Sequence, residues 1–349
     1  MTVRGPIHPA DLGITLMHEH VLLDLSCVRH PPSAPWQEPL VDSTVNLGTR
    51  GLLALDPYVN RANLRLDDPA MARAELRLYL DLGGRSLVDL TVQGLSPRPV
   101  ALRELSEASG VHIVAGCGYY VRAAHPEGLS TRGEQEVAEA LLREITEGFG
   151  ETGIRPGIIG ELGTSSPIHP DEAKVLRAAA RVQRSTGLAI NVHVALWSQE
   201  GLAVLDILES AGADLSRVVL SHLDEVLDLE YHRAVLRRGA YVEYDTFGSE
   251  FYFDSWQRRE ASDSERIDAL LTLLAEGWQE RILLSQDVCT KMHLVGYGGY
   301  GYGHLLRSIV PRLRQRGLDE DMLRMLLVTN PSRVLTSSHP GRDERSDGT

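Results

Sequence analysis

The sequence predicts an α/β fold, a (β/α)8 TIM barrel in which eight parallel strands alternate with helices. Three observations favour it: eight short apolar runs rich in β-forming residues, segments of helical period between them, and the strict alternation of the two patterns. The eight runs are 14–20, 86–92, 112–118, 157–163, 189–194, 218–223, 240–246 and 282–288.

The intervening helices are marked by their termini as well as by their period. Asp67 and Asp68, followed by a proline, open one helix, and Pro170 opens another that Gly187 closes. The predicted helices occupy 67–82, 99–109, 134–149, 174–186, 199–211, 227–238, 263–278 and 305–316.

A doubly wound open sheet is the alternative fold, but it usually has a glycine-rich phosphate loop after its first strand, and this sequence has none there. The Gly-Tyr-rich run at 296–303 follows the eighth strand and lacks the Gly-x-Gly-x-x-Gly spacing. We therefore expect a single domain over 1–336. Residues 337–349, rich in Ser, Asp, Arg and Gly, are predicted to form a disordered tail.

Charge and composition argue against several classes of protein. A net charge of −13 disfavours a nucleic-acid-binding surface. Cys27, Cys117 and Cys289 are far apart and form no Cys-x-x-Cys pair, which disfavours a disulfide framework or a zinc ribbon. No stretch approaches the ~18 apolar residues of a membrane helix, and the first residues lack the apolar core of a signal peptide. We expect a cytoplasmic protein with neither nucleic acid nor membrane as a partner.

The most informative short motif is His18-Glu19-His20, at the end of the first predicted strand. Alternate side chains of a strand share a face, so His18 and His20 project together while Glu19 points the other way. Two imidazoles on one face can hold a transition metal. A half-buried strand end with two hydrogen-bonded histidines is the other interpretation.

Further residues of metal-binding type end other predicted strands. The C-terminal ends of all the strands of a (β/α)8 barrel meet at one rim, where active sites lie. Each residue alone has a structural explanation, such as a helix cap or a histidine bonded to the backbone. Their recurrence at corresponding strand ends favours a metal site, and six ligands exceed the needs of one tetrahedral zinc, which predicts two metals. The six are His18, His20, Glu161, His193, His222 and Asp287.

The motifs around these residues resemble those of the phosphotriesterase family of the amidohydrolase superfamily. The resemblance covers the chain from about residue 3 to about residue 335 and is strongest to the phosphotriesterase-related and phosphotriesterase-homology proteins. Its motifs are Thr-Leu-Met-His-Glu-His at 15–20, Gly-Ile-Ile-Gly-Glu-Leu-Gly-Thr-Ser at 157–165, Val-Leu-Ser-His at 219–222, Ser-Gln-Asp at 285–287 and Tyr-Gly-Gly-Tyr-Gly-Tyr at 297–302.

The resemblance implies a hydrolase with two divalent metal ions, zinc in the first place, with manganese, cobalt or iron as alternatives. It implies His18, His20 and Asp287 at one ion, His193 with His222 at the other, and Glu161 as the bridge. Phosphotriesterases proper and the related lactonases carry a carbamylated lysine where Glu161 stands. The lactonases also carry an arginine where Thr246 stands. These two differences disfavour the prediction of phosphotriesterase activity and of lactonase activity for this chain.

Two dications about 3.5–4 Å apart share a bridging water and bring its pKa towards neutrality. We expect the resulting hydroxide to attack the carbonyl of an ester, lactone or amide, with Asp287 passing the proton to the leaving group. A phosphotriester is the alternative substrate. The predicted substrate contacts are Tyr120, where the resemblance implies a substrate-contacting tyrosine, Trp197 and Tyr300.

The roles of three features of the loops stay open. The run at 296–303 fits a mobile lid, because glycine frees the backbone and tyrosines offer contact area, but a turn packed on the barrel explains it equally well. Arg122 and Lys291 could contact an acidic substrate group, and a solvated surface position also explains them.

Two other hypotheses compete with a binuclear hydrolase. One is a non-catalytic barrel that binds a small molecule, because fold alone never guarantees activity. Six converging ligand residues argue against it, since a binding protein has no need of them. A mononuclear, deaminase-like site would leave part of the histidine and carboxylate set without a role. The resemblance also raises a homodimer as an option, and the sequence does not specify the small-molecule substrate.

Overall fold

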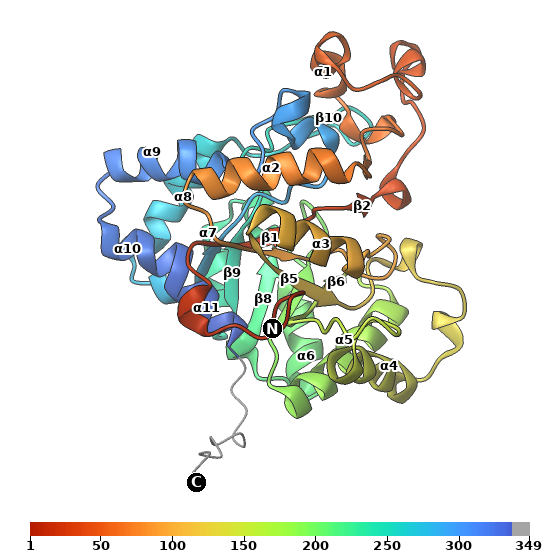
Figure 1. Ribbon diagram of the computed structural model, residues 1–349, viewed down its shortest axis with the longest axis vertical. Coiled ribbons are helices and arrows are strands. Elements are labelled where there is room, and N and C mark those ends of the chain that lie inside the picture. Colours follow the sequence, from red (N-terminus) through yellow and green to blue (C-terminus); the bar gives the residue numbers. More distant parts are fainter. Residues whose placement is uncertain (337–349) are drawn as a thin grey trace.

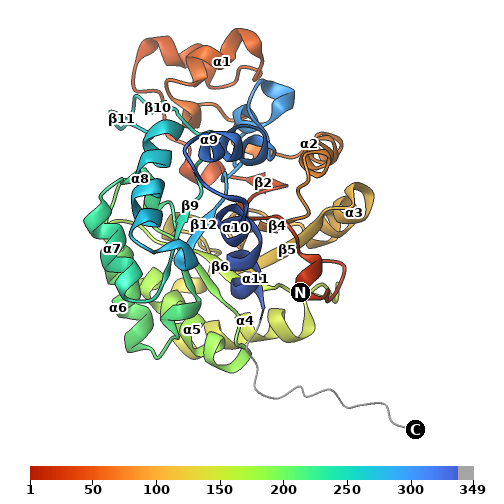
Figure 2. The same ribbon diagram turned by 90° about the vertical axis from the view of Figure 1, so that its left-hand side faces the viewer.

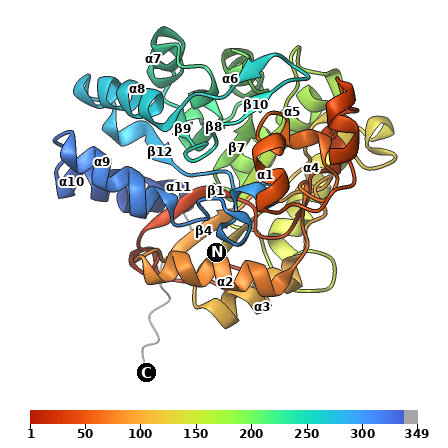
Figure 3. The ribbon, with the colours of Figure 1, turned by 90° about the horizontal axis from the view of Figure 1, so that it is seen from above.

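The computed structural model describes residues 1–336, and the predicted tail at 337–349 lies outside the described residues. Eight parallel strands follow one another around a nearly closed ring, in the order β1-β4-β5-β6-β7-β8-β9-β12. Seen from above, the strands surround a common centre, with the helices outside them (Figure 3). The (β/α)8 barrel is therefore confirmed. Its strands are β1 (Thr15–Glu19), β4 (Ser86–Asp89), β5 (His112–Cys117), β6 (Ile158–Gly163), β7 (Ile190–His193), β8 (Val218–Ser221), β9 (Tyr241–Tyr244) and β12 (Ile282–Leu284).

Helices connect successive strands and lie on the outside of the ring (Figure 1). Local signals start and stop them: Asp68 accepts hydrogen bonds from the backbone N–H groups of Ala70 and Met71, and Gly187 ends its helix in the left-handed region. The connecting helices are α2 (Pro69–Asp81), α3 (Pro99–Ser109), α4 (Glu134–Glu147), α5 (Pro170–Thr186), α6 (Gly201–Ser210), α7 (Leu229–Arg237) and α8 (Asp263–Ala275).

The segment after β12 differs from the expectation. A helix predicted over 305–316 is a π-helical stretch, Leu305–Ile309, that continues into α9 (Val310–Gln315). Two more helices, α10 (Glu320–Arg324) and α11 (Asn330–Leu335), flank a second π-helical stretch, and the sequence analysis did not find them. Within 1–336, every helix is too short or too polar to cross a membrane.

Apolar side chains fill the ring below its rim. Seven strands each contribute one residue to a separate buried cluster, and the residue just before β7 completes it, while the alternating neighbours pack outward against the helices. The strand residues of this inner cluster are Met17, Val88, Val114, Ile158, Val219, Tyr241 and Leu283, and the residue before β7 is Ala189.

A bulge interrupts this alternation in each of two strands, at the place where a predicted ligand lies. In β1 the register with β4 shifts between Leu16 and Glu19, and in β6 the register with β7 shifts between Ile159 and Leu162. The extra residue lets a second consecutive side chain face inward, and these are His18 and Glu161. Gly160 is required beside Glu161, because a Cβ there would collide with the backbone carbonyl of Asn191.

The first and last strands meet at a place that we call the β1–β12 seam. The N–H of Asp287 donates to the carbonyl oxygen of His18 (3.2 Å), and the N–H of His18 donates to Ser285 Oγ (2.9 Å). The Glu19 carboxylate accepts hydrogen bonds from the N–H groups of Gln286 (3.0 Å) and Val288 (2.9 Å). These bonds hold the turn that carries Asp287 against the strand that carries both histidines.

Two segments outside the predicted strands and helices lie over the rim (Figure 2). One contains α1 (Leu47–Leu53) between β2 (Leu23–Asp24) and β3 (Arg65–Leu66), which pair antiparallel. The other is a hairpin of β10 (Tyr252–Phe253) and β11 (Arg258–Arg259). The two segments share a buried apolar cluster that is separate from the barrel interior.

Candidate metal centre

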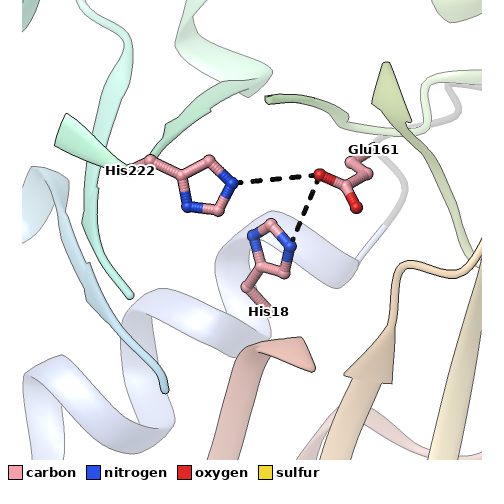
Figure 4. Close-up of side chains that lie close together, drawn as sticks. All are labelled: His18, Glu161 and His222. Atoms are coloured by element: carbon pink, nitrogen blue, oxygen red, sulfur yellow. Dashed lines mark ion pairs between the residues drawn. The ribbon is translucent and has the colours of Figure 1, made fainter. Parts of the chain in front are cut away.

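All six predicted ligands meet at the C-terminal rim. Figure 4 shows His222 entering from the left and His18 from below, both pointing at the carboxylate of Glu161. His18 Nε2 lies 3.6 Å and His222 Nε2 3.9 Å from Glu161 Oε2, and His193 Nδ1 lies 3.3 Å from the same oxygen. Glu161 is only 2 % exposed, so this carboxylate is buried among imidazoles.

The remaining two predicted ligands lie on the other side of Glu161. His20 Nε2 is 3.3 Å from Glu161 Oε1 and 3.3 Å from Asp287 Oδ1, and His18 Nε2 is 3.8 Å from that same Asp287 oxygen. His20 thus faces Oε1 of Glu161, and His193 and His222, whose ring nitrogens are 2.9 Å apart, face Oε2. His18 lies between the two groups, since it is near both Oε2 and Asp287. This arrangement has the shape of two neighbouring sites that share one carboxylate.

His222 and Asp287 reach the centre from the first residues beyond their strands. Both have a left-handed backbone, with φ of 62° at His222 and 45° at Asp287, which is uncommon outside glycine. His222 is fixed there because its own N–H donates to Asp245 Oδ1 (2.9 Å). The surrounding structure therefore holds both side chains inward in conformations that the backbone would rarely choose alone.

Asp245, which the sequence analysis did not single out, contacts two of the histidines from behind. Its carboxylate lies 2.9 Å from His18 Nδ1 and 3.1 Å from His222 Nδ1. His20 is fixed likewise, by Thr91 Oγ1 at 2.9 Å from its Nδ1. With the Nδ1 atom of these three rings engaged by an outer partner, the Nε2 atom of each ring faces the centre. Residues behind the ligands of metal sites orient histidine rings in the same way.

Three of the atoms that face the centre have no hydrogen-bond partner in the protein. His18 Nε2, Glu161 Oε2 and Asp287 Oδ1 are buried and make no hydrogen bond. Buried polar atoms are rarely left without a partner unless an ion or water completes them. His18, His20 and Asp287 offer ligand atoms close enough to hold one ion, as do His18, Glu161 and His222. Imidazole and carboxylate donors suit zinc and related transition metals, so the residues present fit such ions.

Electrostatics in the cluster point the same way. Burial would raise the pKa of Glu161, but the charge of His18 and the close contacts with the surrounding histidines hold this pKa well below its ordinary value. Burial lowers the pKa of His20, but its close contacts with Asp287 and Glu161 and the charges of these two carboxylates outweigh burial and raise the pKa to about 10. The two carboxylates therefore strongly favour positive charge between them, which a divalent cation supplies in a metal site.

A cavity of about 820 Å³ opens above this cluster. Glu161, His193 and Asp287 lie among its lining residues, as do two of the three predicted substrate contacts, Tyr120 and Trp197. The Tyr120 ring is 4.9 Å from that of His193. A ligand in the cavity would thus touch the metal-binding residues and aromatic side chains together.

The third predicted substrate contact, Tyr300, is not among the residues that line this cavity. It is 47 % exposed and stacks on His304, with ring centroids 4.3 Å apart. The rest of the Gly-Tyr run at 296–303 packs on the barrel: Tyr302 is buried and donates to the carbonyl of His20 at 2.6 Å, and the N–H of Gly296 donates to Glu75. The structure therefore corresponds to the packed turn rather than to an open lid.

Comparison with known proteins agrees with the fold. The model of the phosphotriesterase family matches residues 1–335. An N-acetyltaurine hydrolase of Xenopus tropicalis is 37% identical over 341 residues, which cover 96% of this chain and 97% of that protein.

Two solved structures extend the comparison. A resiniferatoxin-binding protein from Rhodobacter sphaeroides is 41% identical with a TM-score of 0.95, over 97% of this chain and 95% of that one. A phosphotriesterase homology protein from Escherichia coli, with phosphate in its active site, is 32% identical with a TM-score of 0.78. The match covers 93% of this chain and 99% of that one.

A (β/α)8 barrel with this cluster at its rim, among relatives named as hydrolases, defines a hydrolytic enzyme. The chain belongs to the phosphotriesterase family.

Proposed function

We propose that this protein is a metal-dependent hydrolase that cleaves the amide bond of a small N-acyl amine with the help of two divalent ions. The observation that carries the proposal is the set of buried, unpartnered ligand atoms around Glu161. The name of the Xenopus relative, an N-acetyltaurine hydrolase, supports an amide over the ester and lactone that the sequence left open. Zinc is the first candidate metal, with manganese, cobalt and iron as alternatives.

The geometry supports a division of the ligands between two positions. His18, His20 and Asp287 would hold one ion, since His20 Nε2 and Asp287 Oδ1 are 3.3 Å apart. His193 and His222 would hold the other. Glu161 would serve both, because its Oε1 faces His20 and its Oε2 faces His193 and His222.

Two such ions would supply a Lewis acid for the carbonyl oxygen and a water acidified towards neutrality. The chain provides the remaining functions. Asp287, which is partly buried beside His18 and His20, accepts the proton that the attacking water loses and gives it to the leaving amine. Tyr120 and Trp197 shield the reacting groups from bulk water and orient the acyl chain.

A glutamate in the bridging position also bears on the choice of substrate. The carbamylated lysine that phosphotriesterases and lactonases carry there is absent, and Thr246 stands where lactonases have an arginine. The Thr246 hydroxyl lies 2.9 Å from Asp224 and 2.8 Å from Glu225, so it belongs to a buried polar network beneath the rim. Lactones and phosphotriesters are therefore the weaker candidates.

The test combines metal analysis with a hydrolysis screen. Protein prepared without chelator is expected to contain about two divalent ions per chain and to hydrolyse N-acetyltaurine faster than aryl esters, lactones or phosphotriesters. Chelator is expected to abolish turnover, and added zinc or manganese to restore it. Less than about one ion per chain, or turnover that survives complete removal of metal, would overturn the proposal.

A further inference from the structure

The outer part of the cavity contains an arginine with no acidic partner. Arg258 lines the cavity, and among the described residues no carboxylate lies within ion-pair distance of it. The other arginine in the lining, Arg122, lies 3.0 Å from Asp171, and the neighbour Arg259 lies 2.9 Å from Glu265. A positive charge left free at the edge of a substrate cavity is a recognition element for an anion.

The hairpin directs Arg258 towards the cavity. Arg258 on β11 is paired with Phe253 on β10, and side chains directly opposite in an antiparallel pair share a face. Phe253 is fully buried and packs against the rings of Tyr58 (5.0 Å) and Trp197 (5.3 Å), both of which line the cavity. Arg258 therefore lies on the same face of the hairpin as Phe253, where its solvent-exposed side chain lines the cavity.

Aromatic side chains form a continuous wall between the metal-binding residues and this arginine. Trp197 follows the strand that carries His193, and its ring lies 5.5 Å from that of Trp256 in the turn of the hairpin. Tyr58 closes the wall from the other side, 5.9 Å from Trp256. Such a wall suits a short apolar spacer, with polar chemistry at its two ends.

We propose that Arg258 binds the anionic end of the substrate, a sulfonate or carboxylate, while the acyl group lies at the metal-binding residues. This inference rests on the proposed function, and it narrows the substrate class to N-acylated amino sulfonates and amino acids. A guanidinium binds two oxygens of such a group in parallel, which gives both attraction and orientation. Neutral amides of the same length lack this contact.

The kinetic test compares three amides of matched length: N-acetyltaurine, N-acetyl-β-alanine and neutral N-(2-hydroxyethyl)acetamide. R258Q is expected to raise KM for both anionic amides by more than about tenfold while KM for the neutral amide stays within about twofold. R258K, which keeps the charge, is expected to recover part of the loss. R259Q removes the adjacent arginine, which is already paired with Glu265, and is expected to match the wild type. Equal changes for all three amides, or an equal loss in R259Q, would overturn the proposal.

A binding measurement separates this proposal from the proposed function. The probe is 1-pentanesulfonate, which has the length and charge of N-acetyltaurine but no bond to hydrolyse. Calorimetric titration is expected to show binding to the wild type and to R259Q, weakened more than about tenfold in R258Q. If amides are not hydrolysed and this pattern holds, the hydrolase proposal fails and the anion site stands. If amides are hydrolysed but R258Q binds the sulfonate normally, the anion site fails.

Discussion

The floor and the wall of the cavity are built differently. On the floor, His18, His20 and His222 each have a second partner behind them, in Asp245 or Thr91, and all six candidate ligands come from strands or from the first residues beyond them. The wall consists of ring contacts between residues of separate loops, such as Trp197 and Trp256. Preorganised groups suit chemistry, whereas loops tolerate change. We therefore expect changes on the floor to affect metal binding and kcat, and changes on the wall to affect KM.

The largest effect is expected from Glu161→Gln. The carboxylate that faces both groups of histidines would become a neutral amide, so metal content should fall below two ions per chain and kcat/KM by more than about a hundredfold. Elemental analysis and steady-state kinetics measure the two quantities. A variant that keeps both ions and wild-type turnover would show that Glu161 is not the bridge.

Asp287→Asn tests the proton transfer. The side chain keeps its size and its place beside His20 but cannot accept the proton, so kcat should fall about 10²–10⁴-fold with KM little changed. The control is the metal content of the same sample. Full turnover in a variant that still binds both ions would exclude Asp287 as the proton carrier.

Asp245→Asn separates the residues behind the ligands from the ligands themselves. Asparagine keeps one oxygen for the two imidazole N–H groups but lacks the negative charge. Metal affinity should therefore fall by about 10–100-fold. Saturating metal should restore much of the activity. Competition with a metal-binding dye measures the affinity. Asp254→Asn, on the β10–β11 hairpin, is the matched control, and an equal loss there would contradict the role of Asp245.

A smaller effect is expected on the wall. Trp256→Ala removes a ring that packs on Trp197 and Phe253. KM should rise by a few fold, which corresponds to the free energy of one aromatic contact, while kcat stays nearly constant. A drop in kcat with constant KM would instead show that Trp256 acts on the reaction step, as the residues of the cavity floor do.

The smallest effect is expected from Tyr300→Ala. Tyr300 is half exposed, lies outside the cavity lining and stacks only on His304, so kcat/KM should stay within about twofold of the wild type. A loss as large as that of Trp256→Ala would show that the run at 296–303 closes over the substrate after all.

The sequence predicted the barrel and the residues at its rim because both depend on local signals. Strand and helix periods located all eight strands, and the rule that strand ends share one rim brought Glu161 and His222 together with the histidines of the first strand. Asp245 obeys the same rule, directly after Tyr244 at the end of β9. The same rule could therefore have identified it, since it lies within the predicted strand at 240–246.

What the sequence did not predict depends on contacts between distant segments. The bulges that turn His18 and Glu161 inward are defined by register with the neighbouring strand, which no single segment encodes. The α1 segment and the β10–β11 hairpin are held together by a cluster that combines Leu53, Phe253 and Met292, far apart in the sequence. The position of Arg258 at the cavity follows from that hairpin, so it too could be recognised only in three dimensions.

The β1–β12 seam lies between His18 and Asp287, two of the groups proposed to hold one ion. An ion shared by them would act as a cross-link between the first and last strands of the ring, in addition to the bonds from Ser285 and Glu19. Its binding energy would then contribute to the stability of the closed barrel as well as to catalysis, because a ligand that binds only the folded state stabilises it. A bound ion would then complete the contact between the first and last strands of the barrel.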